Sequence, residues 1–358
     1  MRKLSLLVEL PKVRETTSLK ILKYACIATV LALVAGAVRI VWDTATARTR
    51  TVKGAEKPAN VAVATQGASV AAEPDAALKN FQARCQAPGV IQCVDFDSDQ
   101  WFQQGVYLYS AWDKVYRGTR DMSVKVSGAS SLRFEFPGHS PANGAGYWTM
   151  EFGRGFAQNS IFFVQYRMRL NDVMAKTDWD KLVGSSWKQS IFHSKGTTCA
   201  SIEITTGRYS WNGVNGFPVM YTECGGRGMS TNKGDPPSKF EQGNYNCWYS
   251  QFNPKDCFFY PANEWMTFYY SVTIGDWGKP NSYVQAWVSH EGQPLKKWID
   301  MPNFILNKDN DSSSYNSITL LPYMTAKKMT ADHPPGYMWF DELIISTKPI
   351  PAPVGPTP

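Results

Sequence analysis

The chain of 358 residues has a formal net charge of +7, and this charge lies in its first 60 residues. Those residues hold eleven Lys and Arg against four Asp and Glu, so the rest of the chain carries 26 charges of each sign. A neutral body excludes a basic nucleic-acid-binding surface as the main function, because such a surface needs clustered positive charge.

Residues 25–38 form an uncharged apolar run of 14 residues behind a basic segment. A membrane span needs about 20 apolar residues, whereas the apolar region of a signal peptide needs about 7–15. Small-residue cleavage patterns follow at residues 35–37 and 45–47. We expect residues 1–42 to be a cleaved signal peptide, with an uncleaved signal anchor as the alternative. Either way the chain is exported, to the periplasm, the medium or the cell surface, and contacts a membrane only through this segment.

Residues 43–77 are rich in Ala, Thr, Val, Gly and Pro and show no sustained period, which predicts a flexible linker. Residues 78–350 have many aromatic residues and little helical periodicity, and about 270 residues suffice for one large core. We expect a single all-β domain of two packed antiparallel sheets. A Pro-rich tail at residues 351–358 follows it.

Six cysteines lie in this domain, and Cys26 lies in the apolar run. Their spacing matches no CxxC zinc ribbon, so we expect structural disulfides formed in an oxidising compartment. Six cysteines allow fifteen pairings, and the sequence alone does not choose among them. We expect the sequential pairing, which closes three short loops: Cys85–Cys93, Cys199–Cys224 and Cys247–Cys257.

Acidic residues alternate in the segment 95–99, a spacing that can supply oxygen ligands for calcium. The segment lacks the Gly and the distal Glu of an EF-hand loop. Asp341, near the end of an aliphatic strand, is a second and weaker candidate for a structural ion site. We expect no required cofactor, and Asp97 and Asp341 are the weak candidate ligands for a structural calcium ion.

Five segments alternate as β-strands with one buried face do. In the first, this period places Trp187, Gln189, Ile191 and His193 on one face and Lys188, Ser190 and Phe192 on the other. The other four segments have an aliphatic face and a second face that carries these side chains: Phe163, Gln165, Arg167 and Arg169; Thr267, Tyr269, Ser271 and Thr273; Tyr283, Gln285, Trp287 and Ser289; Ser317, Thr319, Tyr323 and Thr325. Side by side, about 5 Å apart, the second faces would form one continuous polar and aromatic floor. Such a floor favours a polysaccharide, because aromatic rings stack on sugar rings while amides and guanidinium groups bind hydroxyls and carboxylates.

The order of four segments resembles the jelly rolls of the concanavalin A-like lectin/glucanase superfamily. The segments are Trp-x-Gln-x-x-Phe-His at 187–193, a W-x-x-F-x-x-x-V strand at 265–274, Tyr283–Val288 and Gly336–Thr347. Within that superfamily the sequence is most similar to secreted polysaccharide lyases of the alginate, glucuronan and heparin lyase type, over most of residues 80–350. The resemblance implies a β-sandwich jelly roll with a concave groove, and β-elimination on an anionic polymer of uronic acids.

Such lyases offset the charge of the uronate carboxylate, remove the C5 proton with a base and protonate the departing oxygen with an acid. The resemblance implies that Gln189 and either Arg167 or Arg169 contact the carboxylate, that His193 is the base, and that Tyr323 is the acid or a combined base and acid. An imidazole with a pKa of about 6.5 is a competent base, and a phenol can donate a proton to an alkoxide. The expected sugar-binding residues are Arg169, Tyr269, Tyr283, Gln285, Trp287 and Trp187. The Gln-x-His spacing and the Tyr-Lys-x-Gly-x-Tyr strand of alginate lyases are both absent from the sequence.

Structural readings of the same residues stay open. His193 can be a hydrogen-bonded structural histidine, Tyr323 a packed tyrosine, the two arginines a solvated face, and Tyr283 and Trp287 part of a second small core. A glycoside hydrolase is the weaker enzyme reading, because the Glu-x-Asp-x-x-Glu strand of jelly-roll glucanases is absent from the sequence. The alternative to a lyase is a non-catalytic carbohydrate-binding or surface-adhesion domain.

Overall fold

The structure, a computed structural model, describes residues 76–104, 117–183, 187–195, 198–206, 216–222, 224, 247–248, 251–252, 257–355 and 357–358. The chain divides into two compact units, Met1–Val70 and Ala71–Pro358, and all described residues belong to the second. The predicted signal segment therefore lies outside the described residues. Among the residues described, no helix is long and apolar enough to cross a membrane.

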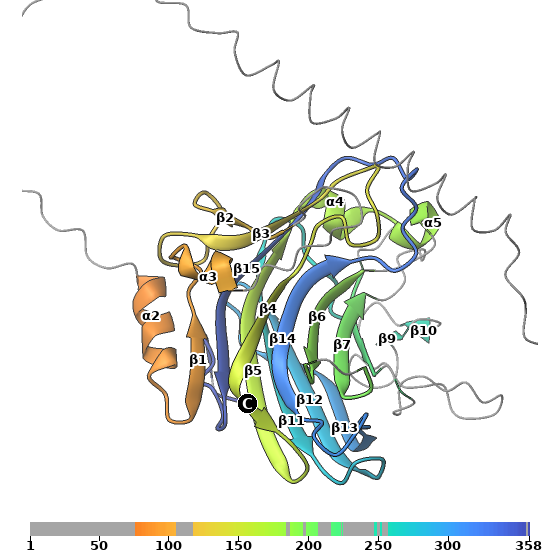
Figure 1. Cartoon of the computed structure of the whole chain (residues 1–358). Coiled ribbons are helices and arrows are strands. Elements are labelled where there is room, and N and C mark those ends of the chain that lie inside the picture. The colour runs from red at the N-terminus through yellow and green to blue at the C-terminus, as the bar shows by residue number, and fades with distance from the viewer. Residues whose placement is uncertain are drawn as a thin grey trace, which may run out of the picture. The chain divides into compact units, whose positions relative to one another are not determined.

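Two antiparallel sheets make up the described part of the second unit (Figure 1). The eight-stranded sheet has the order β13 (Lys296–Ile305), β12 (Pro280–His290), β11 (Trp265–Ile274), β5 (Ser160–Leu170), β15 (Gly336–Ser346), β3 (Ser131–Phe136) and β2 (Thr119–Asp121), and β1 (Val90–Val94) also pairs with β15. The five-stranded sheet has the order β4 (Trp148–Phe156), β14 (Tyr315–Tyr323), β6 (Lys188–His193), β7 (Ser201–Thr206) and β8 (Pro218–Tyr221). A short ribbon joins β9 (Cys247–Trp248) to β10 (Gln251–Phe252). The predicted all-β sandwich of two antiparallel sheets is confirmed.

Short helices accompany the sheets: α2 (Ala76–Cys85), α3 (Gln100–Gln104), α4 (Asp172–Lys176) and α5 (Trp179–Val183). The predicted start of the domain at residue 78 falls inside α2. In Figure 1, α2 and β1 lie on the side of the sandwich away from β7. The side chain of Asn171 caps α4 by accepting a hydrogen bond from the Met174 backbone N–H at 3.0 Å.

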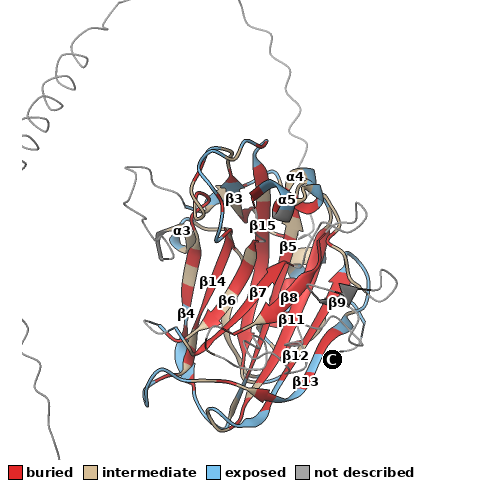
Figure 2. Cartoon of the chain, turned by 90° about the vertical axis from the view of Figure 1, so that its right-hand side faces the viewer, coloured by how far each residue is buried: buried red, intermediate tan, exposed pale blue. Residues whose placement is uncertain are grey.

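Alternating side chains build the core between the inner faces of the two sheets, as Figure 2 shows by the buried colour of the central strands. Tyr166 on β5 and Tyr270 on β11 belong to this core, and Ile318 and Leu320 on β14 meet them from the other sheet. The predicted core faces of the segments 163–170, 267–274, 283–289 and 317–325 are confirmed. Period two therefore identified the inner face of four strands correctly.

A second, smaller core lies on the outer face of the eight-stranded sheet. There α2 and the chain after β15 pack against the sheet, and the buried members are Phe81, Phe163, Tyr269, Trp287, Ile344 and Ile350. The Pro-rich tail is tied down by hydrogen bonds from Gln165 Nε2 to the Pro351 carbonyl at 3.2 Å and from Asn80 Nδ2 to the Pro353 carbonyl at 3.3 Å. This face is therefore covered in its middle by protein.

Two of the three predicted disulfides are confirmed: Cys85–Cys93, which ties α2 to β1, and Cys199–Cys224. Cys257 is also disulfide-bonded. Its predicted pairing with Cys247 stays a prediction, because the side chain of Cys247 is outside the described residues. Structural disulfides persist in oxidising compartments, in agreement with the predicted export.

The loop after β14 holds a buried ammonium group, that of Lys327. Its Nζ donates to the Ser140 carbonyl at 2.6 Å and to Ser140 Oγ at 3.0 Å, and it lies 5.1 Å from the centroid of the Phe136 ring. Burial lowers the pKa of Lys327 from 10.5 to about 8. The group is thus held by neutral partners, and protonation at neutral pH works against folding.

Candidate functional site

An irregularity in β6 decides which of its side chains reach the surface. The pairing of β6 with β7 shifts register between Lys188 and Ser190, and the pairing with β14 shifts between Leu320 and Tyr323. A bulge of this kind inverts the alternation on one side of it. Gln189 and Ser190 both face the core, and Lys188, which the sequence pattern placed on the inner face with Phe192, faces outward.

Gln189 is fully buried in a hydrogen-bonded group of tyrosines. Its Nε2 donates to Tyr166 Oη at 2.8 Å, and its Oε1 accepts from Tyr260 Oη at 2.7 Å. Burial raises the pKa of Tyr166 to about 12, so its hydroxyl stays protonated. Trp187 is buried in the same core, 5.2 Å from the Tyr260 ring. The predicted placement of Gln189 and Trp187 on a substrate-facing surface is therefore wrong.

The outer face of the five-stranded sheet carries a cluster of four side chains around an ammonium group, which we call the Lys188 cluster. Lys188 Nζ lies 2.5 Å from Glu203 Oε2, and the side chains are 13% and 4% exposed. The same nitrogen lies 5.4 Å from the centroid of the Tyr221 ring and 5.3 Å from that of Tyr323. The ammonium group is thus held beside one carboxylate and within reach of two phenol rings.

Strand pairing explains why these residues meet. Lys188 on β6 lies opposite Tyr323 on β14, and Glu203 on β7 lies opposite Tyr221 on β8. Ile202 and Ile204 point into the core, so Glu203 between them points outward. Of the predicted catalytic residues, Tyr323 alone belongs to the cluster. The sequence did contain a signal for Glu203, which is a carboxylate in the middle of the alternating strand Ser-Ile-Glu-Ile-Thr. It contained no signal for the bulge that turns Lys188 outward.

His193 lies on the same outer face as Lys188 but at the far end of β6. Five residues separate the two side chains, which corresponds to about 16 Å along a strand. His193 Nε2 is 2.9 Å from Thr319 Oγ1, which is 2.8 Å from Thr149 Oγ1. Burial lowers the pKa of His193 below its usual 6.5. The imidazole is thus a neutral member of a hydroxyl chain, and the predicted meeting of His193 with Tyr323 and Gln189 does not occur.

The other predicted site residues lie on the outer face of the opposite sheet, across the core from the Lys188 cluster. Tyr269 and Trp287 belong to the second small core, as the structural reading of Trp287 proposed. Burial raises the pKa of Tyr269 to about 12. Tyr283 remains 36% exposed and donates to Asp300 Oδ1 at 2.5 Å, and Gln285 Nε2 donates to both of these groups. The prediction of one continuous floor is therefore wrong, because the polar faces belong to two sheets and point in opposite directions.

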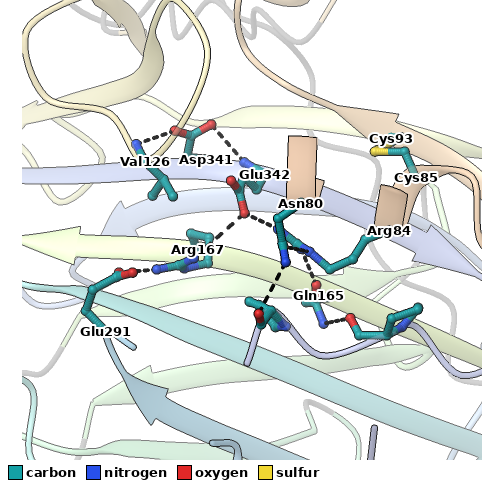
Figure 3. A network of polar contacts seen from close by, with 12 residues as sticks. Asn80, Arg84, Cys85, Cys93, Val126, Gln165, Arg167, Glu291, Asp341 and Glu342 are labelled. Carbon is teal, nitrogen blue, oxygen red and sulfur yellow. Dashed lines mark hydrogen bonds and ion pairs between the residues drawn. A yellow bond between two sulfur atoms is a disulfide. The ribbon is translucent and has the colours of Figure 1, made fainter. Parts of the chain in front are cut away.

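Arg167 takes part in a buried network of charges under α2 (Figure 3). Arg84 from α2 donates to Gln165 Oε1 at 2.5 Å and is ion-paired with Glu342. Arg167 is ion-paired with Glu291 and lies 3.8 Å from the same Glu342 carboxylate. Arg167 is thus ion-paired within the protein through its two terminal nitrogens, while its buried Nε has no partner. It lies on the opposite sheet from His193 and Tyr323, so its predicted contact with the same substrate carboxylate as these residues is wrong.

The two candidate calcium ligands bind backbone groups. Asp97 Oδ1 accepts from the Ala129 and Ser130 N–H groups at 2.6 and 2.8 Å. Asp341 accepts from the Val126 N–H at 2.8 Å, and burial raises its pKa well above the usual value of 3.8. No group of three or more metal-binding side chains occurs among the described residues. A calcium ion at Asp97 or Asp341 stays a prediction.

The carboxylates on the outer face of the five-stranded sheet are badly placed for glycoside hydrolysis. Glu203 on β7 and Glu151 on β4 are separated by three strand spacings, about 14 Å, while hydrolases place their two carboxyls about 5–9.5 Å apart. Each is also ion-paired with a lysine, Glu203 with Lys188 and Glu151 with Lys195. These two residues therefore do not form a hydrolase pair.

Comparisons with known proteins return fold relatives only. No protein-family profile and no curated protein sequence matches the chain. The chain is similar to the solved structure of a PL-14 alginate lyase from Aplysia kurodai, with 13% identity over 72% of this chain and 99% of that one and a TM-score of 0.46. It is also similar to an endo-β-1,4-glucuronan lyase from the fungus Trichoderma reesei (13% identity, 68% and 94% covered, TM-score 0.39). A third is the catalytic domain of a glycoside hydrolase family 131 protein from Coprinopsis cinerea (13% identity, 73% and 96% covered, TM-score 0.41). At these values the side chains of this chain must carry any functional argument.

Proposed function

We propose that the protein is an exported polysaccharide lyase that cleaves an anionic, uronic-acid-containing polymer by β-elimination at the Lys188 cluster. The observation that carries the proposal is the ammonium group of Lys188 between the rings of Tyr221 and Tyr323, fixed by the buried carboxylate of Glu203. The ammonium group supplies the positive charge that β-elimination requires, and the hydroxyl of Tyr323 supplies both the base and the acid.

Lys188 offsets the charge of the uronate carboxylate in this mechanism. Removal of the C5 proton leaves an enolate on that carboxylate, and a fixed cation stabilises the added charge. Arg167 cannot do this, because it lies on the other sheet. Lys188 therefore takes the role that the family resemblance implied for Gln189 and Arg167.

Tyr323 removes the C5 proton and returns a proton to the departing O4 oxygen. In this mechanism the phenolate form of Tyr323 accepts the C5 proton in the first step, and the phenol so formed donates a proton in the second. The C5–H bond breaks as the C4–C5 double bond forms, and the C4–O4 bond electrons leave with the oxygen, which takes the proton. Tyr221 is the second wall of the cluster and supplies a ring face for the sugar.

The test is incubation of the full chain with alginate, glucuronan, pectate and glycosaminoglycans, with detection of the ultraviolet absorbance of the unsaturated uronate. We expect one polymer to give a signal, and Lys188→Met and Tyr323→Phe each to lower kcat at least a hundredfold. His193→Ala is the matched control on the same strand, because it lies about 16 Å away and should keep kcat within a few fold. Full activity of Tyr323→Phe, or loss of activity only in His193→Ala, would contradict the assignment.

The second candidate function is non-catalytic carbohydrate binding on the same face. The two ring faces of Tyr221 and Tyr323 favour it, because stacking requires rings but no proton transfer. Tyr323→Phe separates the two functions, since it keeps the ring and removes the hydroxyl. A binding domain would bind polymer equally with either residue and would produce no unsaturated uronate from any member of the panel.

A further inference from the structure

The outer face of the eight-stranded sheet carries a row of alternating tryptophan and arginine beyond the part covered by α2. Trp265 on β11 lies opposite Arg169 on β5, Arg169 lies opposite Trp339 on β15, and Trp339 lies opposite Arg133 on β3. Four neighbouring strands place these side chains on one face over about 14 Å. With Tyr337, whose ring stacks 5.8 Å from that of Trp339, they form what we call the Trp–Arg strip.

Arg169 is the residue of the strip that lacks a partner within the described part of the protein. Its neighbour two residues earlier, Arg167, is ion-paired with Glu291, whereas Arg169 has no hydrogen bond or ion pair with any described residue. Its Nε atom is buried and unpartnered. A buried guanidinium nitrogen without an acceptor is costly, and a bound anion would satisfy it.

The rest of the strip leaves positive charge and one ring available. Arg133 is 36% exposed, its Nε is also without an acceptor, and its one carboxylate neighbour, Asp121, is 3.7 Å away. Asp121 is already occupied, since it accepts from the Trp339 indole N–H at 2.8 Å and from Ser123. The guanidinium group of Arg133 lies 5.6 Å from the centroid of the half-buried Tyr337 ring. The strip thus offers two planar donors about 10 Å apart, two strand spacings, and an aromatic face beside one of them.

Trp265 and Trp339 are each 7% exposed and belong to neither hydrophobic cluster. As rigid neighbours they limit the rotamers of Arg169, which lies between them, and this reduces the entropy lost on binding. Planar guanidinium groups bind carboxylate and sulfate in a bidentate manner, and a polymer with such groups at intervals matches a row of arginines better than a single small anion does.

We propose that the Trp–Arg strip is a second, non-catalytic binding site for an anionic polysaccharide, in which Arg169 and Arg133 bind the acidic groups and Tyr337 stacks on a sugar ring. The ligand class rests on the proposed function, but the site does not, since it lies across the core from the Lys188 cluster. A polymer held at this face would keep the protein on its substrate between cleavage events.

The experiment measures binding in a Tyr323→Phe background, which removes the hydroxyl needed for cleavage but keeps Lys188, so that the ligand is not consumed and the first site still binds. Titration calorimetry with uronate oligosaccharides should give two sites, and Arg169→Glu should weaken one of them at least tenfold while leaving the other unchanged. Lys279→Glu is the matched charge reversal at an exposed turn of the same sheet and should leave both sites intact. Arg133→Gln, at a half-buried position, should weaken the same site as Arg169→Glu.

Three outcomes would overturn the proposal: a single site in the parent protein, equal effects of Arg169→Glu and Lys279→Glu, or equal binding of a neutral glucan at the strip. Thermal unfolding of each variant identifies any that fail to fold. If Arg169→Glu fails to fold, the binding affinity of Arg133→Gln decides whether the strip binds the polymer. The elimination assay is independent of this result. Two binding sites without any unsaturated uronate would support the Trp–Arg strip and contradict the lyase assignment. Elimination activity with only one binding site would support the lyase assignment and contradict the strip.

Discussion

Replacement of Gln189 with methionine tests whether this residue supports the core or contacts the substrate. Methionine is similar in volume, so the change removes hydrogen bonds with little cavity formation. The amide bonds Tyr166 at 2.8 Å and Tyr260 at 2.7 Å inside the core. Two lost bonds at about 1 kcal/mol each, and the cost of burying hydroxyls with fewer partners, give an expected destabilisation of about 2–4 kcal/mol.

Thermal unfolding measures this effect directly. A domain of this size changes its Tm by about 2 °C per kcal/mol, so we expect Gln189→Met to unfold about 4–8 °C below the parent protein while kcat of the folded enzyme stays within a few fold. Ser190→Ala is the matched control on the same strand. It removes only the 2.9 Å contact with Tyr166 and should cost about 1 kcal/mol. An unchanged Tm with lost activity in Gln189→Met would refute the core placement and restore Gln189 as a substrate contact.

Three further predictions concern buried charged groups. Lys327→Met should stabilise the protein at pH 7, because the folded amine has its pKa lowered from 10.5 to about 8 and the charged form is penalised by up to about 3 kcal/mol. Between pH 8 and 10.5 the unfolded state binds more protons than the folded state, so the stability of the parent protein rises with pH in that window. The stability advantage of Lys327→Met, measured by urea denaturation, should disappear there, and a pH-independent difference would contradict this cause. Arg84→Met should lower the free energy of unfolding by about 3–5 kcal/mol, because Glu342 keeps only its longer ion pair with Arg167. Adding Glu342→Gln should recover part of that loss, and equal denaturation midpoints for the single and double variants would refute the ion pair as the cause. The imidazole of His193 should titrate below pH 6.5 by NMR, as burial lowers its pKa, and a raised value would point to an acidic partner instead.

Period-two alternation was sufficient to predict four strands and their core faces, because burial on one side imposes this period on a strand without a bulge. Val164 and Tyr166, or Ile318 and Leu320, are buried as predicted. Alternation carries no information about the partner strand. The segments around Arg167 and Thr319 read alike in the sequence, yet β5 pairs with β11 and β15 while β14 pairs with β4 and β6. The predicted single floor failed for this reason, since pairing between strands far apart in sequence decides which outer faces meet.

The bulge in β6 changes the proposed site more than the division of the strands between two sheets does. A strict alternation exposes Gln189, an amide that is neutral at every pH, and buries Lys188. With Gln189 and Ser190 both turned inward, Lys188 faces outward opposite Tyr323, and a fixed cation replaces an amide beside the phenol. An amide offers the proposed enolate only a hydrogen bond, whereas an ammonium group also offers it a full positive charge. In the proposed mechanism Tyr323 keeps the combined acid and base role that the resemblance implied, and its cationic neighbour is a residue that no alternating pattern would have placed on its face.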